Sequence, residues 1–571
     1  MSRIEVKKPS LCTNEPFSTE SVSRSLSVLS EIVKSCYGRS GRLKQLHNGM
    51  GGYVCTTSQS CVLLGGLSVT HPVLKLLTAS VQNHKSRFSD CGLFTAILCC
   101  SLVENFRRLN LVSCTVIKIS KHLLSLCTDY LKSEACGCRI SVDFNSTKTL
   151  LCLVRSILTS KPACMLNKKE ADYISTLILK AFLLTIPHNV ETNVALGKCI
   201  IVPVKDKRVA DSNLFPGLLI EIPEFEFPKF PVKRVSSSTI KMALFCISMS
   251  GDFLGAREGT VMVKHGVSLD SAILDQLLNL SKQMVNDGVG LVVCQKVIHP
   301  ALKQYLKEQR VITVDRVGIA MMEPLSQMTG SQPIASLHSL SSSCYGSLKD
   351  LRTETFASKE FLHLIPHDTL VCSLILCNRN ETAWGELKLA CETAEHVLLL
   401  TVKQPLALLG GGCTETHLAS YIRHKSFDMC SSTFKDLCCS PAEYQIVSDA
   451  FCCSVESVAC CLEHDGGEIL IDRHYGHFWS VESGFPSDSD WSNLVLKCGC
   501  GICNNQQNLN WCVLQRQCGR FAPKSCYNET CVNSKDDLVL DCFTAKYNGL
   551  QVAVETANLI LEVSCIIEDQ N

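Results

Sequence analysis

The first part of the chain carries apolar residues at helical spacing. Val22, Leu26, Leu29 and Val33 recur every three or four positions, so they share one face of a predicted helix. Gly38 follows the last of them, at the place where a helix commonly ends on a glycine. This segment therefore predicts an amphipathic helix that packs one face against a core.

Two more helices and a hairpin are predicted before residue 110. His71 and Pro72 open one helix, and another extends over Gly92–Leu109. Between the first two helices, Val54–Leu64 alternates enough to predict a short hairpin. The first part of the chain is accordingly predicted to be mainly helical.

The middle of the chain has a different pattern, in which short apolar runs alternate with amphipathic stretches. The runs have the length of strands and lie at Ala243–Met249, Leu291–Val297 and Val311–Val314. A helix capped by Ser268 and closed by Gly288 is predicted between the first two runs. A helix from Pro300 to Gln309 is predicted between the last two. Such a succession of strand, helix and strand is typical of an α/β domain.

After residue 381 the pattern is helical again. One long helix is predicted over Thr382–Val402, and another over Gly549–Ile567. The second is apolar nearly all round, so we expect it to be buried in a large domain. Helical ends around an α/β middle predict one domain built from both termini with another inserted, and Pro223–Pro231 reads as a loop or linker.

Composition narrows the class of protein. A chain of 571 residues is too long for one hydrophobic core, which predicts about two to four domains. The formal net charge is +1, so no basic field points to nucleic acid. The apolar runs are too short for a membrane span, and the N-terminus lacks a signal-peptide pattern. We therefore expect a cytosolic protein whose 37 cysteines are reduced and mostly buried.

Two glycine turns and one acidic turn are candidates for binding an anion or a metal ion. Gly38 and Gly41 form the first, and the triplet Gly410, Gly411 and Gly412 at a helix start forms the second. Glycine lets a backbone approach a ligand closely, and its free amides can bind phosphate. The first turn could be only a helix C-cap, and the second could equally be a hinge between domains. Asp90, followed by Gly92, supplies a carboxylate for a hard cation such as Mg²⁺.

Cysteine and histidine clusters in the last third of the chain are candidate zinc ligands. Cys498, Cys500 and Cys503 lie close together, with four more cysteines beyond them at 512, 518, 526 and 531. Their spacing is not the paired C-x-x-C of a standard zinc site, so a loop with incidental thiols is the preferred interpretation. His474 and His477 are expected at the surface rather than as ligands.

One further motif is a weak candidate for phosphate binding. Gly197–Lys198 resembles the tail of a Walker A loop, but residue 192 is not glycine and residue 199 is cysteine. The pattern is therefore broken at both ends, and a strand entry is the preferred interpretation.

The motifs taken in order resemble the group II chaperonin family. Tyr37–Lys44 is similar to its G-P-x-G turn, Phe88–Phe94 to its G-D-G-T-T segment and Leu409–Glu415 to its G-G-G-A-x-E segment. Asp211–Gly217 is similar to the motif that enters the family's substrate-binding domain. The similarity covers nearly the whole chain, and its opening residues resemble the McKusick-Kaufman subfamily of chaperonin-like proteins.

The resemblance implies a multidomain α and α/β fold, the group II chaperonin fold. It implies a helical equatorial domain, a hinge-like intermediate domain and an apical α/β domain that binds substrate. The implied segments are 1–150 and 406–571 for the equatorial domain, 151–200 and 371–405 for the intermediate domain, and 201–370 for the apical domain. A cysteine-rich insertion at about 431–535 departs from the family pattern.

The resemblance also implies ATP with Mg²⁺ as a cofactor, bound by the glycine turns and Asp90. The residues for hydrolysis, however, are changed. The family has an aspartate seventeen residues before the glycine triplet, where this chain has Thr393, and another where this chain has Gln59. Neither side chain can act as the base that a carboxylate provides. Glu392 is the one nearby substitute, but helix geometry turns it about 100° away.

Three functions are open for this protein. The first is a chaperonin-like chaperone with weak or no ATP hydrolysis, for which the resemblance implies subunits of the Bardet-Biedl ciliary complex as clients. It also implies other chaperonin-like subunits and the cytosolic CCT chaperonin as partners, and a place at the centrosome or basal body. The second is an ATP-dependent chaperonin subunit, and the third is an unrelated cysteine or zinc enzyme. The insertion predicts a monomer or small hetero-complex rather than a ring.

Overall fold

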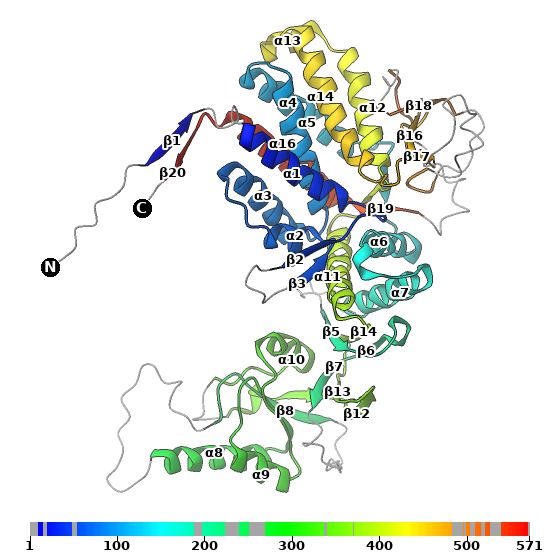
Figure 1. Ribbon diagram of the computed structural model, residues 1–571. Coiled ribbons are helices and arrows are strands. Elements are labelled where there is room, and N and C mark those ends of the chain that lie inside the picture. The colour runs from blue at the N-terminus through cyan, green and yellow to red at the C-terminus, as the bar shows by residue number, and fades with distance from the viewer. Residues whose placement is uncertain are drawn as a thin grey trace, which may run out of the picture. The chain divides into compact units, whose positions relative to one another are not determined.

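The computed structural model describes most of the chain in two compact units. Unit 1 joins both ends of the chain, residues 1–175 and 382–571, and unit 2 consists of residues 176–381 (Figure 1). The described residues are 10–14, 20–47, 54–187, 197–222, 239–250, 269–335, 340–368, 370–481, 495, 498–502, 509–514, 520–525 and 538–568. The predicted cap Ser268, the linker Pro223–Pro231 and Cys503 lie outside them.

Unit 1 is predominantly helical. Its helices are α1 (Glu20–Ser35), α2 (Ser60–Gly66), α3 (Pro72–Phe88), α4 (Gly92–Arg108), α5 (Ser113–Lys132), α6 (Thr147–Thr159), α7 (Lys168–Leu184, continuing into unit 2), α11 (Glu381–Lys403, beginning in unit 2), α12 (Cys413–Phe427), α13 (Ser431–Leu437), α14 (Pro441–Cys460) and α16 (Phe543–Glu562). The helices predicted near residues 22–33, 72, 92–109 and 382–402 are confirmed. Val22, Leu26, Leu29 and Val33 are all buried, as the pattern requires.

The core of unit 1 surrounds α4 and α16. α16 packs against α3, α4 and α5, and α14 packs against α4 and α12. The helix predicted over Gly549–Ile567 is present, but its predicted ends were wrong. It begins at Phe543 and ends at Glu562. The last residues instead form β20 (Cys565–Glu568), which pairs antiparallel with β1 (Leu11–Asn14) near the other end of the chain.

Short sheets connect the helices of unit 1. β15 (Leu406–Leu409) lies between β4 (Arg139–Ser141) and β19 (Leu540–Cys542), and β16 (Glu468–Asp472) lies between β17 (Phe478–Val481) and β18 (Trp511–Val513). The hairpin predicted within Val54–Leu64 was wrong in its second half. β3 (Val54–Thr57) pairs with the upstream β2 (Lys44–His47), while Leu63 and Leu64 are buried on helix α2.

Unit 2 contains the α/β arrangement that the sequence predicted. Its elements are β5 (Lys198–Val204), β6 (Asn213–Pro216), β7 (Leu218–Ile222), β8 (Ile240–Phe245), α8 (Leu269–Asn286), β9 (Val289–Cys294), α9 (Pro300–Glu308), β10 (Ile312–Val314), α10 (Met322–Thr329), β11 (Gly346–Leu348), β12 (Asp350–Phe356), β13 (Lys359–Ile365) and β14 (Val371–Cys377). Strands β8, β9 and β10 are parallel neighbours, with α8 and α9 as the crossover helices.

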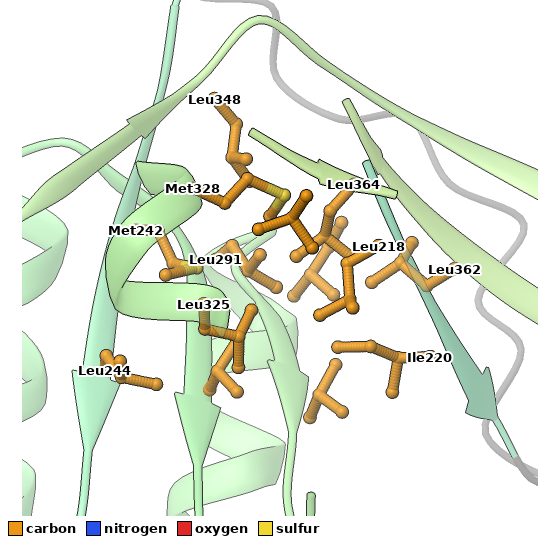
Figure 2. Packing of buried hydrophobic residues seen from close by; sticks show 14 of the residues in the cluster. Leu218, Ile220, Met242, Leu244, Leu291, Leu325, Met328, Leu348, Leu362 and Leu364 are labelled. Atoms are coloured by element: carbon orange, nitrogen blue, oxygen red, sulfur yellow. The ribbon is translucent and has the colours of Figure 1, made fainter. Parts of the chain in front are cut away.

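The described residues of unit 2 form three sheets, in the orders β10-β9-β8-β11, β12-β13-β7 and β5-β14-β6. One hydrophobic cluster joins the first two with α10. Figure 2 shows Leu244 and Leu291 of the parallel strands beside Leu325 of α10, with Leu218 and Leu362 approaching from the second sheet. All five side chains are buried. None of the helices in the described ranges combines the length and apolarity that a bilayer crossing requires.

Candidate functional site

A cavity of about 280 Å³ in unit 1 brings together most of the turns that the sequence singled out. Its walls come from the turn after α1, the start of α2, the α3–α4 junction, the end of α6, the glycine triplet before α12 and the segment around β19. Its lining includes Gly38, Gln59, Lys85, Asp90, Gly92, Lys161, Gly411, Gly412, Asp541 and Lys546. Segments separated by more than 400 residues therefore share one site.

The turn after α1 supplies one wall. Gly38 has a φ of +83°, a conformation that residues with a side chain rarely adopt. Gly41 is not among the lining residues, and its part is structural. A Cβ at Gly41 would lie 2.4 Å from the carbonyl oxygen of Cys36, so only glycine lets the chain turn back there. Of the two predicted glycines, the structure places only Gly38 at the cavity.

Asp90 reaches the cavity from a tight junction between two helices. Ser89 and Cys91, on either side of it, both have a φ of +59°. A Cβ at Gly92 would lie 2.2 Å from Oγ of Ser60, so glycine is required where α4 begins. Leu93 follows Gly92 and also lines the cavity, and its side chain can donate no hydrogen bond to a phosphate.

Two lysines surround Asp90, and the sequence reasoning missed both. Burial acts to raise the pKa of Asp90, but Lys161 and Lys85 together lower it below its usual value. Asp90 therefore stays ionised at neutral pH and can serve as a ligand for a hard cation. Burial in turn lowers the pKa of Lys85, and the charge of Asp90 opposes that change.

Thr393 does not line the cavity, but it contacts a residue that does. The Lys85 ammonium donates a hydrogen bond to Oγ1 of Thr393 over 3.1 Å. Glu392 lies elsewhere on α11, with its half-exposed carboxylate 3.8 Å from the Lys388 ammonium. Like Thr393, Glu392 is not among the described residues that line the cavity, so the expectation that helix geometry turns Glu392 away stays a prediction.

Gln59 and the two residues before it are held by Glu386, a buried residue of α11 that the sequence reasoning did not identify. The Gln59 side-chain amide donates to the Glu386 carbonyl oxygen over 2.9 Å. Thr57 Oγ1 donates to the Glu386 carboxylate over 2.6 Å, and the Ser58 amide also donates to it. Glu386 thus accepts hydrogen bonds from three donors of the turn before α2. Glu386 lies seven residues before Thr393, which is about two helical turns, so the two side chains share one face of α11. That spacing is the sequence signal that could have identified Glu386.

The glycine triplet lies beside a buried ion pair network. Gly411 and Gly412 line the cavity with φ of +60° and +82°, while Gly410 packs against Val539 and is not part of the lining. The Lys546 ammonium pairs with Asp541 and lies 2.7 Å from the Glu415 carboxylate. Burial acts to lower the pKa of Lys546, but the carboxylates of Asp541 and Glu415 raise it well above its usual range.

The sequence carried a signal for this network. Lys546 is a cation in α16, a helix whose other faces are largely apolar, and such a charge is buried only with a partner. Asp541 lines the cavity and lies five residues earlier in the chain. The cavity therefore retains two carboxylates, Asp90 and Asp541, neither of them at position 59 or 393.

The weak Walker-like candidate has a structural role. Gly197 and Lys198 lead into β5, where Lys198 pairs with Val371 in register. A Cβ at Gly197 would lie 1.6 Å from the carbonyl oxygen of Leu370, so glycine is needed for the strands to meet. The preferred interpretation of a strand entry is confirmed.

Comparisons with known proteins agree with the geometry. Residues 29–571 match the TCP-1/cpn60 chaperonin family. Molecular chaperone MKKS of Homo sapiens is 60% identical over 572 residues, and its counterpart in Mus musculus is 58% identical, with both chains covered completely in each case. Thermosome subunit beta of Methanothermobacter thermautotrophicus is 22% identical over 472 residues, which is 80% of this chain and 81% of that protein.

Proposed function

Because the chain belongs to the TCP-1/cpn60 chaperonin family, we propose that it is a chaperonin-like molecular chaperone with weak or no ATP hydrolysis. Under this proposal unit 1 contains the equatorial, nucleotide-facing part, and unit 2 contains the apical part that binds clients. The relatives named as molecular chaperones over their full length support the general activity. The absence of a carboxylate at positions 59 and 393, beside the cavity in unit 1, supports weak or no ATP hydrolysis.

The charges around the cavity suit a magnesium-bound polyphosphate. Asp90 would hold Mg²⁺, while Lys161 and the turn at Gly38 would face the phosphates, and Gly411 and Gly412 would allow a close approach on the opposite wall. ATP would supply the phosphate anhydride whose binding or cleavage drives a chaperonin. The residues present therefore fit binding.

The observation that carries the proposal is the contact between Lys85 and Thr393. Activation of water for phosphate hydrolysis needs a base within hydrogen-bond reach. Here the position that the family resemblance assigns to a carboxylate holds a hydroxyl, and an ammonium donates to it over 3.1 Å. A donor in contact with a hydroxyl cannot accept a proton, and Gln59 cannot replace the missing base.

Nucleotide binding and turnover on the purified full chain test this proposal. We expect Mg-ATP binding that Asp90→Asn weakens, and phosphate release far below that of a competent group II chaperonin assayed in parallel. Thr393→Asp combined with Gln59→Asp should raise turnover per bound nucleotide. Glu392→Gln is the matched control on α11 and should change neither. Wild-type turnover equal to the competent chaperonin would reject the proposal in favour of an ATP-dependent folding subunit.

For clients and partners, we propose subunits of the Bardet-Biedl ciliary complex, related chaperonin-like subunits and the cytosolic CCT chaperonin. We also propose that the protein acts in the cytosol at the centrosome or basal body. The family resemblance supports these assignments. Affinity capture from ciliated cells, with imaging of a tagged chain, tests them, and absence of every ciliary-complex subunit from the captured material would contradict the client assignment.

Unit 2 offers a residue with which client binding can be examined. Ile319 is 79% exposed, more than any other large apolar side chain among the described residues. Ile319→Ser should weaken binding of an unfolded client if unit 2 holds it, because apolar contact drives such binding. Val112→Ser is the matched control, since Val112 is 72% exposed but lies in unit 1. An equal effect of the two substitutions would argue against unit 2 as the client-binding part.

A further inference from the structure

We propose that Cys413, His477, Cys498 and Cys500 form a structural zinc site. All four residues are buried, and their ligand atoms, three thiol sulfurs and one imidazole nitrogen, lie within 4.8 Å of one another. Three cysteines and one histidine are a common ligand set for structural zinc, which prefers sulfur and nitrogen in a tetrahedral arrangement. This inference is independent of whether the cavity binds nucleotide.

The four residues come from three segments that are distant in the sequence. Cys413 is the first residue of α12, immediately after the glycine triplet. His477 ends the turn between β16 and β17, and Cys498 and Cys500 lie in the segment 498–502. The expectation that His477 is a surface residue was wrong, because its exposed fraction is 0%. The spacing of the cysteines from 498 onward gave no sign of the two ligands from other elements.

The distances suit a small tetrahedral ion. Zinc bonds of about 2.3 Å to sulfur and 2.0 Å to nitrogen place a sulfur and a nitrogen about 3.5 Å apart, and two sulfurs about 3.8 Å apart. Sγ of Cys500 lies 3.7 Å from Nδ1 of His477. Sγ of Cys498 lies 3.1 Å from Sγ of Cys500, beyond the ~2.0 Å of a disulfide bond. Separating these two sulfurs by less than one ångström would bring them to the tetrahedral distance.

Surrounding hydrogen bonds position the ligands. The Cys500 amide donates to Sγ of Cys413 over 3.3 Å, a contact that stabilises a thiolate. The buried carboxylate of Asp472 accepts from the amides of His474 and His477 and from the Trp479 indole. Asp472 thereby holds the β16–β17 turn in one conformation. A metal site needs such support so that its ligands converge before the ion arrives.

Two glycines allow the segments to approach closely enough. A Cβ at Gly411 would lie 2.1 Å from the Gly499 carbonyl oxygen, and a Cβ at Gly499 would lie 2.0 Å from the Gly411 carbonyl oxygen. The backbone of the cysteine segment is also anchored on both sides. The Gly499 amide donates to the Phe478 carbonyl over 2.8 Å, and the Val539 amide donates to the Cys500 carbonyl over 3.0 Å.

The site is structural rather than catalytic. Four protein ligands leave no open position for water or substrate, and all four residues are buried. The ion would tie the insertion at about 431–535 to the turn that opens α12. Gly412, Phe478 and Gly499 are the chain neighbours of the four ligands, and all three line the cavity described above. Zinc would therefore stiffen one wall of that cavity.

Metal analysis of the full chain, produced with zinc in the medium and purified under reducing conditions, tests the proposal. We expect about one zinc per chain in the wild type, and less than about a tenth of that in Cys500→Ser. Cys452→Ser removes an equally buried thiol outside the cluster and should keep the zinc. His477→Cys should also keep it, because four cysteines form a standard site.

Cobalt substitution gives a second readout that does not depend on stability. Co²⁺ exchanged into the wild type and Cys452→Ser should show the intense visible bands of tetrahedral thiolate coordination, and Cys500→Ser should not. The proposal is overturned if the wild type carries no zinc and yields no such spectrum. Recovery of Cys498 and Cys500 as a disulfide in metal-free, folded protein would overturn it as well.

Discussion

Replacement of Lys546 by methionine removes the cation at the centre of the buried network in unit 1. Methionine keeps most of the volume of the lysine side chain but cannot pair with Glu415 or Asp541. The Lys546 side chain is 4% exposed and that of Glu415 is 1% exposed, whereas Asp541 is 28% exposed. Most of the loss in stability therefore comes from leaving the Glu415 carboxylate unpaired, since Asp541 keeps partial access to water.

The magnitude follows from the burial of Glu415. Leaving one member of a buried ion pair without its partner costs about 3–5 kcal/mol of unfolding free energy. We expect Lys546→Met to reach that range. The double variant Lys546→Met with Glu415→Gln removes both buried charges and should cost less than the single variant, by at least about 1 kcal/mol.

Urea unfolding, followed by tryptophan fluorescence to which the buried Trp479 of unit 1 contributes, measures these differences. Glu392→Gln is a suitable control on an exposed carboxylate and should change the free energy by less than about 0.5 kcal/mol. A single variant as stable as the wild type would refute the reasoning. A double variant less stable than the single one would refute it too, because the penalty would then come from packing rather than from the charge of Glu415.

The pH dependence gives an independent check. The folded-state pKa of Lys546 lies above its ordinary value of 10.5, since Asp541 and Glu415 outweigh the effect of burial. The contribution of Lys546 is thus fully present below pH 10.5 and is lost as the pH rises through the folded-state value. The stability gap between wild type and Lys546→Met should stay constant up to about pH 10 and narrow only above it.

Further outcomes are expected elsewhere in the chain. Gly411→Ala should lower the melting temperature by several degrees, because its Cβ would meet the Gly499 carbonyl oxygen, whereas Gly385→Ala in α11 meets nothing within 4 Å and should raise stability by about 0.5–1 kcal/mol. Leu291→Ala in the core of unit 2 should cost about 2–5 kcal/mol and speed proteolysis of residues 176–381, without abolishing Mg-ATP binding. Sedimentation of the purified chain should show a monomer or small complex, and a homogeneous ring of this chain alone would contradict that prediction.

Helices with one apolar face were the most predictable part of the fold. The periodic positions Val22 to Val33 form α1, and Gly92 begins α4 as expected. Local chemistry sufficed there because the period of a helix is written into adjacent residues. The end of the chain was less predictable. Cys565–Glu568 became a strand because Leu11–Asn14, more than 550 residues away, offers it a partner.

The candidate site divides in the same way. Gly38, Asp90 and Gly411 were found from sequence motifs, and the structure places all three around one cavity. Lys85 and Glu386 were not found, because nothing near them in the chain marks a lysine that donates to Thr393 or a glutamate that holds Gln59. Their roles depend on which helices come into contact.

By itself the sequence determined the chemical groups available: glycines able to turn, one acidic residue between α3 and α4, and threonine and glutamine at positions 393 and 59. Only the tertiary structure decided which groups meet. Cys413, His477 and Cys500 are too far apart along the chain to form a recognisable metal-binding motif. Folding nevertheless brings their ligand atoms within 4.8 Å of one another. The physical reason is that ligands and charges act over a few ångströms in space, whereas sequence patterns record only distance along the chain.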